Sequence, residues 1–151
     1  MAVDVWVMRL DRAATRAACG AIVAGHPGCA ASFSDSDGVA ILAVAAEGTV
    51  GADVERMRNR PRLDAVARRV FSSAEARQVE TAEGDQRLSI FYRGWTAAEA
   101  SAKARGQGLP AMLGERSLPA LPVTWFEPAP GFVAAVATPG DAPRLRLREL
   151  R

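Results

Sequence analysis

The first residues of the chain follow a pattern with a period of two, in which valine alternates with other side chains over residues 3–7 (VDVWV). This alternation predicts a first strand. An alanine-rich segment follows, and Asp11 stands where a side chain would cap a helix over about residues 12–24. The glycines and proline of residues 25–28 predict a turn after that helix.

Shorter apolar runs separated by polar turns continue the chain to residue 55. The turns are expected at residues 35–38, which are polar, and at 47–49, which contain a glycine. Three strands are predicted between and beside these turns, at 31–34, 39–45 and 50–55. The run 39–45 is almost entirely apolar, which predicts a buried strand, and we expect it to form a hairpin with 50–55.

Helical patterns dominate the next part of the chain, and strand patterns return near its end. After an arginine-containing and proline-containing connection, three helices are predicted, the second capped by Ser72. Residues 109–122 are irregular and rich in proline. Trp95, Trp125 and Phe126 are interpreted as core residues. The expected elements are helices at 63–70, from residue 72 onward and at 86–104, a hairpin of 123–127 with 132–137, and an edge strand at 144–150.

The order of these elements is strand-helix-strand-strand, followed by strand-helices-strand-strand. This order predicts an α+β fold of two similar α/β halves, related by a pseudo-twofold axis, that meet at a shared interface. The chain of 151 residues is long enough for one compact domain, 1–151, with halves 1–49 and 50–151.

The amino-acid composition restricts the classes of protein to which the chain can belong. The chain is 49% hydrophobic and 24% charged, which is typical of a folded soluble protein. Its net charge of +2 does not indicate a nucleic-acid partner. Cys19 and Cys29 lack metal-ligand spacing and are interpreted as small apolar groups. We expect no signal peptide, no membrane span and a cytoplasmic location.

Two carboxylates stand two residues apart in the strand predicted at 50–55. Because side chains two apart on a strand point to the same face, Asp53 and Glu55 are expected side by side. Like charges this close are costly unless water, protonation or a cation separates them, and Mg²⁺ is a natural cation for such oxygens. The alternative is an ordinary solvated strand end.

The single lysine of the chain, Lys103, lies one helical turn after Glu99, which in turn lies one turn after Trp95. On a helix these three side chains share one face. Glu99 could complete a three-carboxylate metal site with the strand pair, and Lys103 could stabilise charge on a phosphate. The alternative is a helix ion pair worth about 0.2–0.5 kcal/mol.

Several segments, in the same order, resemble motifs of the 4′-phosphopantetheinyl transferase superfamily. Two carry most of the resemblance: the family shows a Gly-x-Asp-x-Glu strand and, later, a Trp-x-x-Lys-Glu-(Ser/Ala)-x-x-Lys helix. The matching segments are GADVE at 51–55, WTAAEASAK at 95–103, GQGL at 106–109, FSSAE at 71–75, GFVAAVA at 131–137 and SFSDS at 32–36. The resemblance covers about residues 25–137 and is specific because several motifs agree.

The resemblance implies a particular reaction, in which the phosphopantetheine arm of coenzyme A moves to a serine of an acyl or peptidyl carrier protein. By position, Asp53, Glu55 and Glu99 match ligands of Mg²⁺, and Glu99 also matches a base that takes the serine proton. Lys103 matches a lysine near the transferred or leaving phosphate. The fused two-half arrangement resembles the surfactin-synthetase-type class, with a shortened N-terminal half, and a monomer is expected.

Contacts to coenzyme A are also implied by position. His26 stands at the basic place of a Gly-Lys-Pro turn, although a histidine in a turn is also often simply exposed. Ser36 lies in the segment that matches Asn-(Leu/Ile)-Ser-His-Ser, whose histidine contacts the coenzyme A phosphates. We therefore predict that His26, Ser36 and Lys103 bind coenzyme A.

The sequence departs from the family at two of these positions. Asp35 replaces the histidine of Ser-His-Ser, and Ala98 replaces the lysine before the helix glutamate. These departures leave open a non-catalytic relative that binds a carrier protein or coenzyme A without turnover. A metal-dependent enzyme acting on another phosphate ester is a further alternative. The alternating arginines at 56, 58, 60 and 62 predict either a solvated loop or a landing site for an acidic carrier protein.

Overall fold

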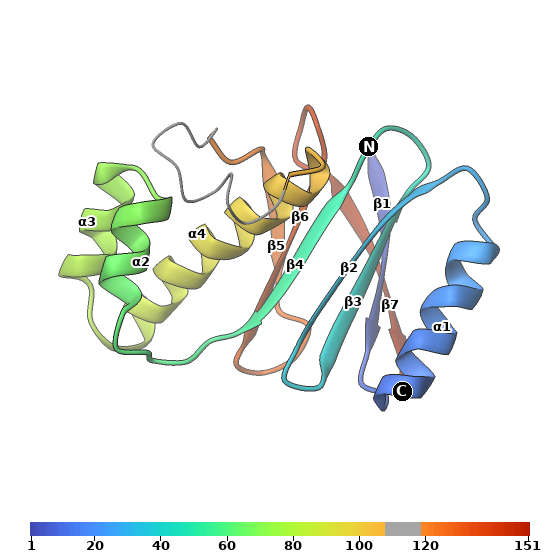
Figure 1. The fold of residues 1–151 in the computed structure, drawn as a ribbon, viewed down its shortest axis with the longest axis horizontal. Coiled ribbons are helices and arrows are strands. Elements are labelled where there is room, and N and C mark those ends of the chain that lie inside the picture. Colours follow the sequence, from blue (N-terminus) through green and yellow to red (C-terminus); the bar gives the residue numbers. More distant parts are fainter. Residues whose placement is uncertain (108–118) are drawn as a thin grey trace.

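A computed structural model describes residues 1–107 and 119–151 of the chain, which form a mixed α+β fold with two sheets (Figure 1). The strand order is β2-β3-β1-β7 in the larger sheet and β4-β6-β5 in the smaller one. The elements are β1 (Ala2–Met8), α1 (Arg12–Ala24), β2 (Ala30–Ser36), β3 (Val39–Ala45), β4 (Gly51–Arg56), α2 (Leu63–Val70), α3 (Ser73–Thr81), α4 (Gly84–Ala104), β5 (Val123–Phe126), β6 (Phe132–Ala137) and β7 (Arg144–Leu150).

The two central strands of the larger sheet, β1 and β3, are buried on both faces, and the side chains of β1 alternate between these faces. Val3, Val5 and Val7 belong to the core between the two sheets, whereas Trp6 and Met8 pack with α1. In the middle of this sheet β1 pairs antiparallel with β3 and parallel with β7. The last strand of the chain therefore completes the sheet that the first strand begins.

The smaller sheet lies between the larger sheet and α4. Alternate residues of β6 face the two sides: Val136 joins the core between the sheets, and Ala135 and Ala137 pack against Ala100 and Ala104 of α4. Figure 1 shows α1 on one side of the sheets and α2, α3 and α4 on the other. Among the described residues, no helix is both long and apolar enough to cross a membrane.

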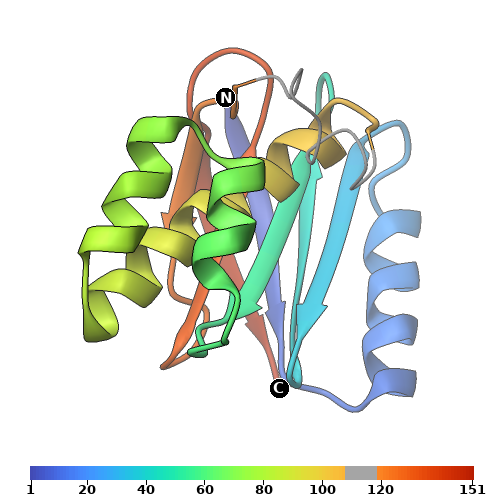
Figure 2. The same ribbon diagram turned by 60° about the vertical axis from the view of Figure 1, so that its left-hand side comes forward.

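The two sheets meet where β2 runs beside β4 (Figure 2). Three serine hydroxyls of β2 accept hydrogen bonds from alternate backbone N–H groups of β4, at 3.0–3.1 Å. The pairs are Ala52 N with Ser32 Oγ, Val54 N with Ser34 Oγ, and Arg56 N with Ser36 Oγ. We call this row of contacts the serine ladder; it joins strands that the two sheets do not pair through their backbones.

Most elements predicted from the sequence are confirmed, including the mixed α+β class, helix 12–24 and the hairpin of β5 with β6. Asp11 caps α1 as expected, with Oδ1 accepting the Ala14 N–H at 2.7 Å. The strand over 144–150 is confirmed at a sheet edge. The similarity of two halves and the division after residue 49 stay predictions. Part of the irregular segment expected at 109–122 lies outside the described residues.

Three expectations are wrong. The runs 39–45 and 50–55 do not form a hairpin, because β4 takes its backbone partner from β6 in the other sheet. The strand expected at 31–34 runs from Ala30 to Ser36, so the turn is confined to Asp37 and Gly38, both with positive φ. Trp125 is not a core residue but 40% exposed: the Arg93 guanidinium lies 5.7 Å from the centre of its ring, and its indole N–H donates to the Arg93 carbonyl at 3.1 Å.

Candidate active site

Three carboxylates from two elements converge beside the serine ladder. Asp53 and Glu55 project from β4, and Glu99 projects from α4. Each offers an oxygen, and these oxygens all lie within 4.8 Å of one another. The structure thus brings together the three residues that the sequence predicted as metal ligands.

The convergence depends on how closely α4 lies on β4. At Gly51 a Cβ atom would overlap the carbonyl oxygen of Ala100 and approach the Ala104 nitrogen to 2.6 Å. A glycine is therefore needed at this point of the strand. The same contact brings Glu99, the neighbour of Ala100, to the level of Asp53.

Asp53 is the most enclosed member of the cluster, with only 2% of its surface exposed. Burial is the main cause that raises its pKa to about 8, because a buried charge loses its hydration. The nearby charges of Glu99 and Glu55 raise the pKa further, while Lys103 and Ser34 oppose the shift. Without a cation the cluster thus holds more negative charge than its surroundings neutralise.

Glu55 shares this environment but has a neutral partner. Burial is again the main cause that raises its pKa, and the indole N–H of Trp95, which donates to Glu55 Oε1 at 3.3 Å, lowers it. The sequence correctly placed Trp95 in an apolar cluster, where it stacks on Phe91, but missed its contact with the carboxylate. Trp95 and Glu99 are four residues apart and share one face of the helix, and this spacing was the signal in the sequence that Trp95 lies near the carboxylates.

Lys103 reaches across the junction of the two sheets. Its ammonium donates to the Ala52 carbonyl at 2.9 Å and to the Phe33 carbonyl at 3.2 Å, one from each strand. It also lies 3.7 Å from Asp53 Oδ1. Because an ammonium has three N–H groups, one donor remains beyond the two carbonyls.

One carboxylate oxygen of the cluster is left without a bonding partner. Within the described residues, Asp53 Oδ2 is buried and has no hydrogen-bond partner. A buried carboxylate oxygen without a partner is costly, and bound cations commonly provide one. Three carboxylates suit a hard divalent cation such as Mg²⁺ or Mn²⁺. The residues therefore fit a metal, with Asp53, Glu55 and Glu99 as its ligands.

The other two predicted contacts of coenzyme A have partners elsewhere. The Nδ1 atom of His26 contacts the Ile22 carbonyl at 2.7 Å, and its ring packs edge-on against Trp6. Ser36 Oγ accepts the N–H of Arg56 in the serine ladder. The structure therefore gathers the acids and Lys103 into one site but does not place His26 among them.

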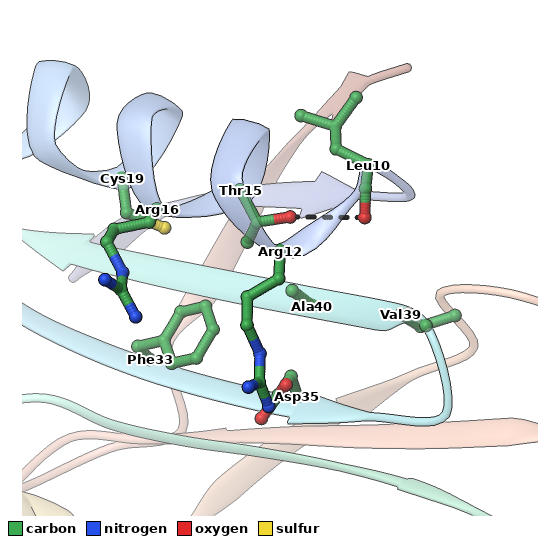
Figure 3. A pocket seen from close by; sticks show the side chains of 10 residues that line it. Leu10, Arg12, Thr15, Arg16, Cys19, Phe33, Asp35, Val39 and Ala40 are labelled. Atoms are coloured by element: carbon green, nitrogen blue, oxygen red, sulfur yellow. Dashed lines mark hydrogen bonds between the residues drawn. The ribbon is translucent and has the colours of Figure 1, made fainter.

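A cavity of about 690 Å³ lies between α1 and the face of β2 opposite the serine ladder. Figure 3 shows Arg12 and Arg16 extending from α1 toward Phe33 and Asp35. We call it the arginine pocket. Sequence reasoning missed these arginines, although their spacing of four on a predicted helix was the signal for a shared face.

The alternating arginines that begin at Arg56, the last residue of β4, are partly neutralised within the chain. Arg56 and Arg58 both form ion pairs with Asp37 at the tip of the β2-β3 hairpin, the first at 3.0 Å. All three side chains are substantially exposed, so these pairs contribute little to stability. Whether Arg60 and Arg62 form a landing site for a partner stays a prediction.

Comparison with known proteins agrees with this geometry. A sequence model of the 4′-phosphopantetheinyl transferase superfamily matches residues 49–128, which include all three carboxylates and Lys103. The transferase HetI of Nostoc is 31% identical over 123 residues, covering 72% of this chain and 51% of its own. A putative 4′-phosphopantetheinyl transferase of Synechocystis is 35% identical over 78 residues, covering 52% of this chain and 32% of its own.

The transferase AcpT of Escherichia coli is 40% identical over 70 residues, covering 46% of this chain and 35% of its own. The chain thus spans about a third to a half of the length of these curated relatives. The family model covers more than half of the chain, and its match contains the acidic cluster. The chain belongs to the 4′-phosphopantetheinyl transferase superfamily.

Proposed function

We propose that the chain is a Mg²⁺-dependent 4′-phosphopantetheinyl transferase that acts on an acyl or peptidyl carrier protein. The observation that carries this proposal is the convergence of Asp53, Glu55 and Glu99 around a buried oxygen that lacks a partner. Coenzyme A is the proposed donor, and a monomer in the cytoplasm is the proposed form.

In the proposed reaction, the serine oxygen of the carrier bonds to the phosphorus that bears the pantetheine arm. The bond from that phosphorus to the bridging oxygen breaks, and 3′,5′-ADP leaves. Glu99 accepts the serine proton, directly or through water. Lys103 uses its remaining N–H to stabilise negative charge on a phosphate oxygen. When bound, Mg²⁺ neutralises charge on the diphosphate.

The arginine pocket supports a place for the nucleotide part of coenzyme A. Arg12 and Arg16 supply positive charge to the N-terminal half, and Phe33 offers an aromatic surface that is 42% exposed. Arg12 extends toward Asp35 (Figure 3). His26 and Ser36 stay proposed contacts; His26 would use Nε2, because Nδ1 already contacts a carbonyl.

Incubation of the whole chain with coenzyme A, Mg²⁺ and a panel of apo carrier proteins tests the proposal. Intact-mass spectrometry should show one phosphopantetheine arm added to a carrier, and chelation of Mg²⁺ should prevent it. No mass increase on any acyl or peptidyl carrier would contradict the proposal. Replacing Arg12 and Arg16 by glutamine should raise the KM for coenzyme A, whereas Arg77→Gln on exposed α3 should not.

A carrier-binding protein without turnover is the second candidate. Asp35 and Ala98, which stand in place of basic residues of the family motifs, favour it. This candidate predicts that a carrier protein binds without modification and that coenzyme A binding does not depend on Mg²⁺. Calorimetry with each partner separates it from the transferase.

A further inference from the structure

Ser34 occupies the centre of the serine ladder and is 7% exposed. Its Oγ accepts the Val54 N–H at 3.1 Å and donates to Asp53 Oδ1 at 3.0 Å. A hydroxyl has a single hydrogen to donate. That hydrogen is therefore committed to the carboxylate.

The contact divides the two oxygens of Asp53 into different roles. Oδ1 receives the Ser34 hydroxyl and lies 3.7 Å from the Lys103 ammonium, whereas Oδ2 is buried without a partner. Rotation of the carboxylate plane away from this angle would take the accepting oxygen out of reach of the Ser34 hydroxyl and would break the hydrogen bond. The hydrogen bond thus selects one orientation of the side chain.

We propose that Ser34 is a positioning residue that orients Asp53 so that Oδ2 is presented to the divalent cation. This inference rests on the metal site of the proposed function and assigns a role to a residue outside the acidic cluster. Groups that hydrogen-bond a ligating side chain commonly change metal affinity by 10–100-fold when they are replaced.

A neutral hydroxyl suits this role better than a charged donor. A cation bonded directly to Asp53 would cancel the charge that attracts the metal. In this structure the nearby cation, Lys103, donates its hydrogen bonds to the carbonyls of Phe33 and Ala52 and stays 3.7 Å from Asp53 Oδ1, so it offsets the charge of Asp53 only in part. Ser34 fixes the carboxylate and leaves its charge available.

The serine ladder contains its own control. Ser32 Oγ accepts the Ala52 N–H at 3.0 Å, as Ser34 accepts that of Val54, but this hydrogen bond of Ser32 involves no carboxylate. Ser32→Ala and Ser34→Ala each remove one acceptor for a β4 N–H. Only Ser34→Ala also removes the hydrogen bond to Asp53.

The test is calorimetric titration of the whole chain with Mn²⁺, which uses the same oxygen ligands as Mg²⁺. We expect Ser34→Ala to weaken Mn²⁺ binding by about 10-fold or more and Ser32→Ala to weaken it by less than about 3-fold. Urea unfolding without metal should show a loss of stability in both variants. Ser34→Cys, which keeps the size but donates weakly, should also lose affinity if Ser34→Ala does not fold.

Each outcome bears on the inference. Unchanged Mn²⁺ affinity in a folded Ser34 variant would overturn the positioning role while leaving the metal site intact. Equal losses in Ser32→Ala and Ser34→Ala would also overturn it, because the ladder as a whole would then be responsible. Absence of binding to the unmodified chain would overturn both this inference and the proposed metal-dependent function.

Discussion

Asp4 and Asp53 are two poorly exposed carboxylates on strands of different sheets, and they are neutralised in opposite ways. Arg146 donates to both oxygens of Asp4, at 3.0 and 2.8 Å, and Arg148 adds a contact at 3.4 Å. These arginines hold the pKa of Asp4 below its ordinary value. The pKa of Asp53, by contrast, is raised to about 8.

The difference follows from the neighbours that each strand receives. β7 pairs in parallel with β1 and sets Arg146 directly opposite Asp4. β4 instead receives Glu99 from α4 and a neutral hydroxyl from β2. The comparison separates a carboxylate whose charge the chain neutralises from one whose charge the chain leaves poorly compensated.

The largest expected effect comes from removing the third carboxylate. Glu99→Gln keeps the size of the side chain but removes one proposed metal ligand, which is also the proposed base, so transfer should fall by at least about 10²-fold. Steady-state kinetics on a carrier protein measures this effect. The control is Glu47→Gln in the exposed turn after β3, which should keep full activity; a Glu99→Gln variant with near-normal activity would contradict the assignment.

The close approach of α4 to β4 is tested by Gly51→Ala. Because the new Cβ would overlap the Ala100 carbonyl, we expect a loss of about 3 kcal/mol in the free energy of unfolding and weaker Mn²⁺ binding. Gly20→Ala in α1 meets no atom within 4 Å and should stabilise the protein by up to about 1 kcal/mol. Urea unfolding measures both; an unaffected Gly51→Ala would show that α4 is free to shift.

Removal of charge should change the stability of the metal-free protein in opposite directions at the two aspartates. Asp53→Asn removes a buried, poorly compensated charge, and the free energy of unfolding near pH 8 should rise by on the order of 1 kcal/mol. Asp4→Asn removes the charged acceptor of hydrogen bonds from two arginines, so it should lower the free energy of unfolding. Urea titrations with a chelator present measure both; a loss of stability in both variants would refute the contrast.

The same contrast predicts opposite pH dependences in the metal-free protein. In the folded protein the pKa of Asp53 lies above its ordinary value of 3.8, so folding favours the protonated form of this carboxyl. The stability that the protonated group contributes to the fold is therefore lost as the pH rises from about 3.8 toward about 8. In the folded protein the pKa of Asp4 lies below its ordinary value, so folding favours the ionised form of this carboxylate. The stability that its ion pairs contribute to the fold is therefore present at neutral pH and is lost as the pH falls.

Unfolding measured at pH 6 and pH 8 tests the Asp53 contribution. The protein should lose stability at pH 8, the loss should be smaller in Asp53→Asn, and added Mg²⁺ should stabilise more strongly at pH 8 than at pH 6. Equal stabilisation by Mg²⁺ at both pH values would indicate that Asp53 releases no proton when the metal binds.

Much of the fold and of the acidic cluster was predictable because it depends on local pattern. The alternation over 3–7 and the cap at Asp11 fix elements through neighbouring residues. The spacing of two on a strand also placed Asp53 beside Glu55. The spacing of four on a helix put Glu99 and Lys103 on one face, although the ion pair of Lys103 is with Asp53. The convergence of these two pairs was predicted through the family resemblance.

What the sequence did not reveal depends on partners far along the chain. The turn at 47–49 is compatible with a hairpin, and only the pairing of β4 with β6 excludes one. In the sequence, Ser34 is indistinguishable from an ordinary strand residue, because its two partners belong to β4, which lies beside β2 only in the folded chain. The arginine pocket requires the packing of α1 on the larger sheet, which no local pattern specifies.

The central claim is that Asp53, Glu55 and Glu99 together hold one divalent cation. A crystal structure of the chain with Mn²⁺, examined by anomalous scattering, tests it most directly. We expect one strong peak at bonding distance from Asp53 Oδ2 and from an oxygen of each glutamate, and no such peak in Glu99→Gln. A peak elsewhere, or no peak with all three carboxylates ordered, would show that these three side chains do not bind a cation together.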